Sequence, residues 1–130
     1  MTCYDKVTFS LVAEIPEFVP DADSIGLQYL VAGDFARFLL DAFRENDLAL
    51  VQRGLVFIEN LYFSDDAKVK ELATVGYLED IQNIWGNKDV DTELIFSMLG
   101  KESKKWWVEL NRFWDGQIKY LGETYAIDQV

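Results

Sequence analysis

Carboxylates are the residues of this chain that could do chemistry, because it has 23 Asp and Glu residues and no histidine. Histidine is the commonest general base and transition-metal ligand, so Ser–His–Asp and Cys–His sites cannot form within the chain. Two carboxylates alone can hydrolyse a glycoside, but no spacing singles out two of the 23. The residue types therefore predict a protein that is not an enzyme and that binds no cofactor or metal.

Two acidic motifs come closest to a cation site, and both depart from the pattern that such a site needs. Residues 89–93 (DVDTE) begin like a calcium-binding loop, but Leu94 stands where that loop needs glycine and Gly100 where it needs a bidentate glutamate. Asp21 and Asp23 would bind a hard cation only with distant ligands. A turn at the start of a helix explains this pair more simply.

The charge of the chain points to a partner rather than a substrate. The formal net charge is −11, and a field of this sign argues against nucleic acid and membranes as partners while speeding encounter with a basic protein. Residues 59–100 carry nine acids and three bases, whereas residues 101–120 carry five bases and three acids. We therefore predict a partner-binding surface formed by the carboxylates Asp65, Asp66, Glu71, Glu79, Asp80, Asp89, Asp91 and Glu93. At each of these positions the alternative is an ordinary solvated side chain.

Helical periodicity dominates the elements that must position these residues. Residues 28–45 give the clearest helix, with an apolar stripe of Val31, Phe35, Phe38, Leu39, Ala42 and Phe43. Asp34, Arg37, Asp41 and Arg44 fall on the opposite face at spacings that suit an ion-pair ladder, and we interpret them as a solvated face. Residues 5–15 alternate like a strand but also fit a helix; no second strand is available to pair with them, which favours the helix.

Turn residues divide the rest of the chain into further helices. Asp47 is expected to cap a helix over 48–63, and Ser64 or Asp65 one over 66–85, where Gly76 would permit a close approach of helices. Thr92 or Asp91 would cap a short helix over 92–99 that ends at Gly100 as a C′ glycine. The prediction is a single all-α domain over residues 1–130, with about six helices in a compact bundle or a short stack of helix pairs.

The last predicted helix, residues 101–121, is both basic and aromatic. Its apolar arc of Trp106, Leu110, Phe113, Trp114 and Leu121, with Trp107, Ile118 and Tyr120 at the margins, is wider than one core-facing stripe needs. Most of these side chains are expected in the core. One or two could remain exposed, and exposed Trp and Tyr are typical of binding hot spots.

The ends and the hydropathy of the chain suggest its location. The first residues lack a basic region followed by an apolar run, and no apolar stretch approaches the roughly 20 residues that span a bilayer. With one cysteine, no internal disulfide can form. We expect a cytoplasmic protein.

Several stretches occur together in an order that resembles a known type of protein. They are residues 14–18 (EIPEF), 33–38 (GDFARF), 57–61 (FIENL), 72–79 (LATVGYLE) and 98–100 (MLG). This order resembles a family of small, acidic, all-helical bacterial proteins that look like immunity proteins, the antidotes encoded beside secreted antibacterial toxins. The resemblance covers most of the chain and transfers no catalytic residue.

The resemblance and the acidity together imply a protein that occludes the active site of a cognate, basic toxin, as a monomer or weak homodimer. The alternative is a helical scaffold or adaptor that self-associates, or binds a partner, through its aromatic last helix. A third possibility, a carboxylate enzyme or small-ligand binder, would require a conspicuous cavity with converging acids of perturbed pKa.

Overall fold

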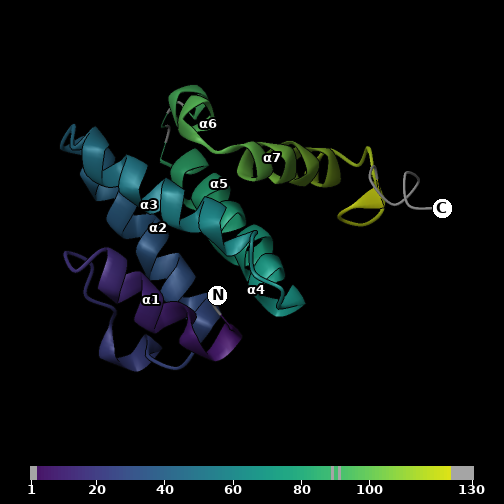
Figure 1. The fold of residues 1–130 in the computed structure, drawn as a ribbon. Helices are drawn as coiled ribbons and strands as arrows, with labels where there is room; N and C mark the ends of the chain where they lie inside the picture. Colours follow the sequence, from purple (N-terminus) through teal and green to yellow (C-terminus); the bar gives the residue numbers. More distant parts are fainter. Residues whose placement is uncertain (1–2, 89, 91, 124–130) are drawn as a thin grey trace.

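A computed structural model describes residues 3–88, 90 and 92–123, and all regular structure in this part of the chain is helical (Figure 1). The elements are η1 (Tyr4–Lys6), α1 (Val7–Glu14), η2 (Ala22–Ser24), α2 (Gln28–Arg44), α3 (Leu48–Leu61), α4 (Ala67–Glu71), η3 (Leu72–Leu78), α5 (Glu79–Gly86), α6 (Glu93–Met98) and α7 (Lys101–Trp114). Because α4, η3 and α5 follow one another without a break, they correspond to the single helix predicted over 66–85. The prediction of a compact all-α fold of about six helices is confirmed, and the ambiguous segment 5–15 is helical as far as Glu14.

Side-chain caps fix where two of the helices begin. Asp47 accepts a hydrogen bond from the backbone N–H of Leu50 at 3.2 Å, which confirms it as the cap of α3. The cap of α4 is Asp66, not Ser64 or Asp65 as predicted. One carboxylate oxygen of Asp66 accepts from the backbone N–H of Lys68 at 2.9 Å, and the other accepts from that of Tyr4 at 3.0 Å. Asp66 therefore ties the N-terminal segment to the start of α4.

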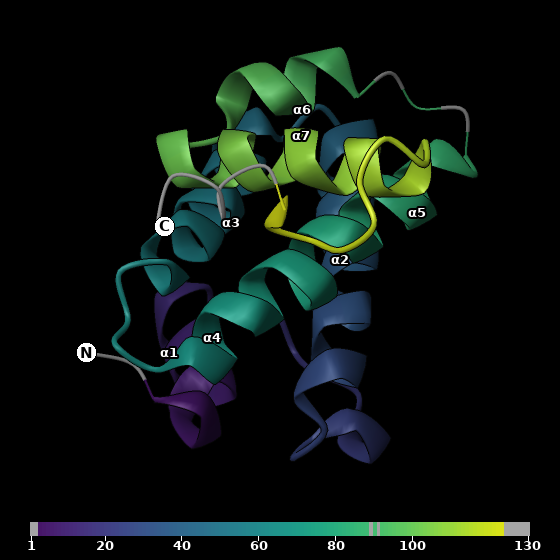
Figure 2. The same ribbon diagram turned by 90° about the vertical axis from the view of Figure 1, so that its right-hand side faces the viewer.

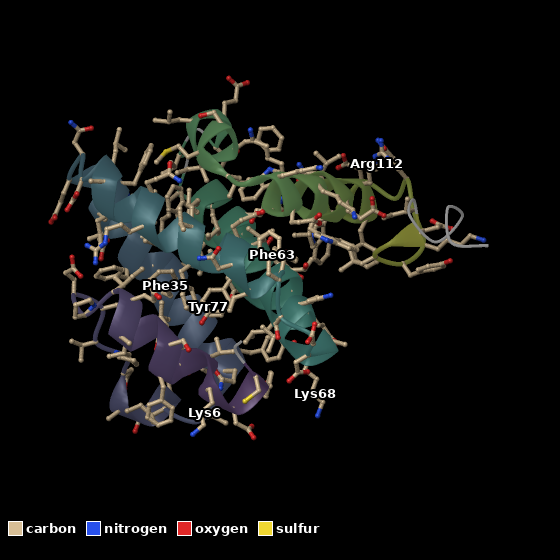
Figure 3. The ribbon with its side chains drawn as sticks, in the orientation of Figure 1. Lys6, Phe35, Phe63, Lys68, Tyr77 and Arg112 are labelled. Atoms are coloured by element: carbon tan, nitrogen blue, oxygen red, sulfur yellow. The ribbon has the colours of Figure 1, made fainter. Side chains whose placement is uncertain are left out.

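The core is centred on α2 and η3. Helix α2 packs against η3, α5 and α3, while η3 also contacts α4 and α7. Of the predicted stripe, Val31, Phe35, Leu39 and Ala42 are buried, and Phe38 and Phe43 are half-buried. The rings of Phe35 and Tyr77 meet edge to face with centroids 5.9 Å apart (Figure 3). The amphipathic pattern of α2 thus fixes the orientation of the central helix.

The segment η3 is π-helical, a feature that the sequence did not predict. A π turn is wider than an α turn, and it disturbs the side-chain register of the helix that contains it. The expected close approach at Gly76 is present, since a Cβ there would lie 3.4 Å from Ala32 Cβ and 3.4 Å from the ring of Tyr29, both on α2. The π segment and α2 therefore meet almost backbone to backbone.

Helix α7 is shorter than predicted and buries a different face. It ends at Trp114 rather than near residue 121, and Gly116, with φ +75°, turns the chain there. Its buried residues include Ser103, Trp107 and Leu110, whereas Trp114 is 57% exposed. The prediction that placed Trp114 in the apolar arc and Trp107 at its margin is therefore wrong. The expectation of one or two exposed aromatic side chains is confirmed.

The junction before α7 also differs from the prediction. Gly100 has φ −72° and directly precedes α7, so it is not a left-handed C′ glycine of α6. Its missing side chain leaves space for Glu59 of α3, whose carboxylate a Cβ at Gly100 would overlap. Glu59 accepts hydrogen bonds from the backbone N–H of Glu102 (3.1 Å) and from the N–H and hydroxyl of Ser103 (2.9 and 2.8 Å). A carboxylate from another helix thus caps the positive end of α7.

Candidate functional site

A shallow groove on the outer face of α2 gathers three aspartates. The groove has a volume of about 390 Å³. Its lining residues are Phe18, Val19, Asp21, Asp34, Arg37, Phe38 and Asp41, and we call it the α2 groove. One guanidinium faces three carboxylates there, and the remaining lining is apolar. This combination suits a cationic group attached to an apolar stem.

The groove follows from the helical period of α2 and from the path of the chain before it. Asp34, Phe38 and Asp41 lie one turn apart along one face of α2. Phe18, in the segment between α1 and η2, is buried against Phe35 and Phe38 with ring centroids 5.1 and 5.3 Å away. Because Phe18 points inward, the next residue, Val19, is 82% exposed at the edge of the groove.

An ion pair fixes the segment that contains Phe18. Arg53 of α3 donates hydrogen bonds to both carboxylate oxygens of Glu17 and to the backbone carbonyl of Glu14, the last at 3.2 Å. The Arg53 hydrogen bond lowers the pKa of Glu17 below its ordinary value. This exposed pair contributes little to stability, but it sets the position of one wall of the groove.

The carboxylates at the floor of the groove are unequally solvated. Arg37 donates to Asp34 Oδ1 at 3.0 Å, while Asp34 Oδ2 is buried and has no hydrogen-bond donor among the described residues. Asp80 of α5 lies beside this pair: burial, and secondarily the neighbouring Glu79, raise the pKa of Asp80 to about 6, and Arg37 partly offsets both effects. Two acids, Asp34 and Asp80, therefore share one arginine where α2 meets α5, which leaves an excess of negative charge.

The carboxylates predicted from the sequence lie on separate elements. Asp65 precedes α4, Glu71 ends α4 and Glu93 begins α6, and all three are exposed. Asp66 is used as a helix cap, and Glu79 and Asp80 are half-buried on α5, where burial also raises the pKa of Glu79. Asp89 and Asp91 lie outside the described residues. Among the described members of the predicted set, Asp80 lies beside the Asp34–Arg37 pair of α2.

From their spacing alone, Asp34 and Asp41 are interpreted as part of a solvated helix face. The spacing of the acids on α2 was visible in the sequence, but the crossing of Phe18 and Val19 over that face was not. Of the expected ion-pair ladder, the structure has the Asp34–Arg37 pair. The groove could therefore have been suspected from the acids alone, but not its apolar half.

A second groove, of about 430 Å³, lies between the end of α3, the π segment and α7. Its lining residues are Tyr62, Phe63, Lys70, Glu71, Thr74, Val75, Glu102, Lys105, Trp106 and Leu121. Phe63 is 66% exposed (Figure 3), and the buried hydroxyls of Tyr62 and Thr74 are hydrogen-bonded at 2.7 Å. The two lysines and two glutamates of this groove balance one another. Its size fits a small ligand, but its charge favours neither an anion nor a cation.

The described residues 3–88, 90 and 92–123 contain no group of three or more His, Cys, Asp or Glu side chains placed to hold a metal ion. Within the same residues, no helix is both long and apolar enough to cross a lipid bilayer.

The fold defines a class: a small all-helical protein, here with a groove lined by three aspartates. The chain belongs to a family described as "Domain of unknown function (DUF7674)", whose model matches residues 9–115. The match begins within α1 and ends just after α7, so it includes every residue of the α2 groove. No curated protein and no solved structure matches the chain.

Proposed function

We propose that this protein binds a basic partner protein through the α2 groove. The partner would be a toxin, and the protein an immunity-type antidote that covers the toxin's active site in the bacterial cytoplasm. The observation that carries the proposal is the juxtaposition, in one groove, of Asp21, Asp34 and Asp41 with the exposed Val19 and the half-buried Phe38. The identification of the partner as a toxin rests on the resemblance to immunity proteins.

The chemistry of the groove matches a lysine or arginine of a partner. The apolar stem of such a side chain can lie on Phe38 while its charged end reaches Asp34 or Asp41. The net charge of −11 would steer a basic protein toward this surface.

The carboxylates predicted from the sequence have two roles in this proposal. Asp80, with its neighbour Glu79, adds negative charge beside Arg37, which lines the α2 groove. Asp65, Glu71 and Glu93, together with Asp89 and Asp91, contribute to the steering field from other parts of the chain. Asp66 serves mainly as the cap that joins α4 to the N-terminal segment.

Calorimetric titration with the protein encoded by the adjacent gene tests this proposal. We expect 1:1 binding that weakens as salt rises. The double substitution Asp34→Asn and Asp41→Asn should raise Kd about tenfold or more. The matched pair Asp65→Asn and Glu71→Gln removes the same charge from exposed positions near and on α4, and it should change Kd less than about threefold.

The outcomes of this titration distinguish the α2 groove from other acidic surfaces of the chain. If the two double variants lose affinity equally, the acids act only through the overall field, and the α2 groove is not the interface. If the α4 pair loses more, the surface predicted from the sequence is the better choice. If the neighbouring protein does not bind, the antidote proposal fails.

A scaffold or adaptor function has its own supporting observation. Trp114, Tyr120 and Phe63 are 57%, 55% and 66% exposed, so aromatic side chains suited to a contact surface lie on and around α7. Sedimentation equilibrium over a range of concentrations tests self-association through this surface. A strict monomer, unchanged by Trp114→Ala, would exclude it.

A further inference from the structure

A groove of the opposite charge lies between α6 and α7, which run side by side across one end of the molecule (Figure 2). It has a volume of about 570 Å³ and is lined by Phe96 of α6 and by Lys101, Lys104, Lys105 and Val108 of α7. None of these lining residues is acidic, although the chain as a whole has a net charge of −11. We call it the α6–α7 groove. It shares no residue with the α2 groove.

The spacing of the lining residues places the positive charge on a single face of α7. Lys101, Lys104, Lys105 and Val108 follow the i, i+3, i+4, i+7 pattern of a single helical face. The buried stripe of α7 fixes the rotation of the helix and turns this face outward, and the Glu59 cap fixes its first turn. The lysine stripe is therefore held in place by the core.

The lysines of the stripe differ in how their charge is used. Lys105 is 3.8 Å from Glu102, on the same helix, and also lies over the ring of Trp106. Lys104 Nζ lies 5.8 Å from the ring centre of Phe96, a cation–π contact that leaves its charge in place. Within the described residues, neither Lys101 nor Lys104 has a carboxylate within ion-pair distance. Two cations of the groove thus lack acidic partners from this part of the chain.

We propose that the α6–α7 groove binds an acidic amphipathic helix of a partner protein. Carboxylates one turn apart on such a helix would face Lys101 and Lys104, and an apolar residue on its next turn would contact Phe96 and Val108. Val108 is 37% exposed, so apolar surface is available at the end of the stripe. A helix fits better than a small anion, because the groove is shallow and follows the axis of α7.

A nucleic acid is a poorer match to the same groove. Its phosphates would meet three lysines at this site, but the remaining field of the chain would repel a long polyanion. The apolar residues Phe96 and Val108 also need an apolar group opposite them, which a helix side chain supplies. The two grooves share no lining residue, so the proposal does not rest on the function proposed above.

Fluorescence anisotropy with the full chain and a labelled helical probe peptide tests the proposal. The probe is a peptide of about 14 residues in an Ala/Gln host, with Glu at three positions spaced i, i+3, i+4 and Leu at i+7. A control peptide has the same composition in scrambled order. We expect saturable binding of the patterned peptide that weakens as salt rises, and binding about tenfold weaker for the scrambled one.

Protein variants locate the binding site. Lys101→Glu with Lys104→Glu should weaken binding about tenfold or more, whereas Lys68→Glu with Lys70→Glu, the same charge change on α4, should weaken it less than about threefold. Phe96→Ala should weaken it several-fold without changing the salt dependence. Circular dichroism of each variant confirms that it is folded.

Several results would overturn the proposal. An equal loss of peptide affinity in both lysine-pair variants, or retained binding in the Lys101→Glu, Lys104→Glu variant, would show that these lysines do not form the site. Equal affinity for the scrambled peptide, or no binding of the patterned peptide at millimolar concentration, would show that the groove does not recognise the helical pattern. Displacement of the peptide by a single-stranded oligonucleotide of equal charge at lower concentration would assign the groove to nucleic acid instead.

Discussion

The body of the molecule and its last helix differ in the contacts that hold each of them in place. In the body, α2 and α3 approach closely because α3 has a glycine, Gly54, opposite Leu39 and Phe35. Helices α6 and α7 are attached by side chains that bond to backbone groups: Glu59 to the start of α7, Gln52 to the carbonyl of Met98 at 3.1 Å, and Gln82 to that of Trp107 at 3.1 Å. The acidic surface therefore lies on a tightly packed apolar unit, whereas the basic surface lies on a helix that joins these polar contacts to the burial of its own Trp107 and Leu110.

The substitution Gly54→Ala is expected to have the largest effect, because it acts on the packing of the body. A Cβ at this position would lie 2.7 Å from Leu39 Cδ2 and 3.0 Å from Phe35 Cζ, and both side chains are fully buried. Overpacking of this kind should lower the free energy of unfolding by about 3 kcal/mol. Urea denaturation followed by tryptophan fluorescence measures the change.

Gly86→Ala is the matched control for this prediction. Gly86 is the last residue of α5, and a Cβ there would meet no atom within 4 Å. Since alanine is the better helix former, this variant should be unchanged or more stable by about 0.5 kcal/mol. Equal destabilisation by both substitutions would mean that the close approach of α2 and α3 is not what Gly54 provides.

The substitution Glu59→Ala tests the polar attachment of α7 and should have an intermediate effect. It removes three hydrogen bonds to the first turn of α7 and a negative charge from the positive end of that helix. We expect a loss of about 2 kcal/mol in unfolding free energy. Amide hydrogen exchange should become faster at Ser103 and its neighbours, while the amides of α2 remain protected.

Gly100→Ala should reproduce the effect of Glu59→Ala, because the new Cβ displaces the same carboxylate. The double variant should therefore be little less stable than either single variant. If the two losses add, or if exchange quickens throughout α2 and α3, then α7 is not a separately attached element and the comparison with the body fails.

The sequence predicts the body better than the attachment of α7. The period of Val31, Phe35 and Leu39 reveals the buried face of α2 because local spacing alone determines it. The contact between Glu59 and Gly100 cannot be found in this way, because the two residues are far apart in sequence and meet only in the folded chain. The π segment could not be predicted for a similar reason. Gly76 indicates a close approach of helices, but no local pattern specifies the wider turn.

The candidate sites were likewise predictable from the sequence only in part. The acids of α2 and the lysines of α7 are visible as helical stripes, so their charge could be predicted. Part of the apolar lining of each groove comes from another element, Val19 in one and Phe96 in the other, and this part could not be predicted. The high density of acids predicts a binding surface within residues 59–93, but the carboxylates there are spread over several elements. A stretch rich in acids is not a patch unless the fold brings the acids to one face.

The smallest expected effect belongs to Asp80, a carboxylate set between α2 and α5. Burial raises the pKa of Asp80 to about 6 from an ordinary value of 3.8. The folded protein therefore binds this proton more tightly than the unfolded chain. The resulting stabilisation is fully present below pH 3.8 and is lost as the pH rises through 6. Asp80→Asn should remove this pH dependence and, at pH 7, should raise the unfolding free energy by about 1 kcal/mol after allowance for the partial exposure of the side chain.

Urea denaturation between pH 3.5 and 7.5 tests this prediction, with Asp41→Asn as a control that removes the same charge from the exposed part of α2. The gain from Asp80→Asn should shrink toward pH 3.5, where the Asp80 carboxyl is neutral in the folded protein and mostly neutral in the unfolded chain, and it should grow through the interval up to pH 6. NMR titration of the Asp80 carboxyl carbon should give a midpoint near 6. A gain that is constant with pH, or a midpoint near 4, would show that Asp80 is solvated. The Asp80 carboxylate would then be an ordinary surface charge rather than a buried group between α2 and α5.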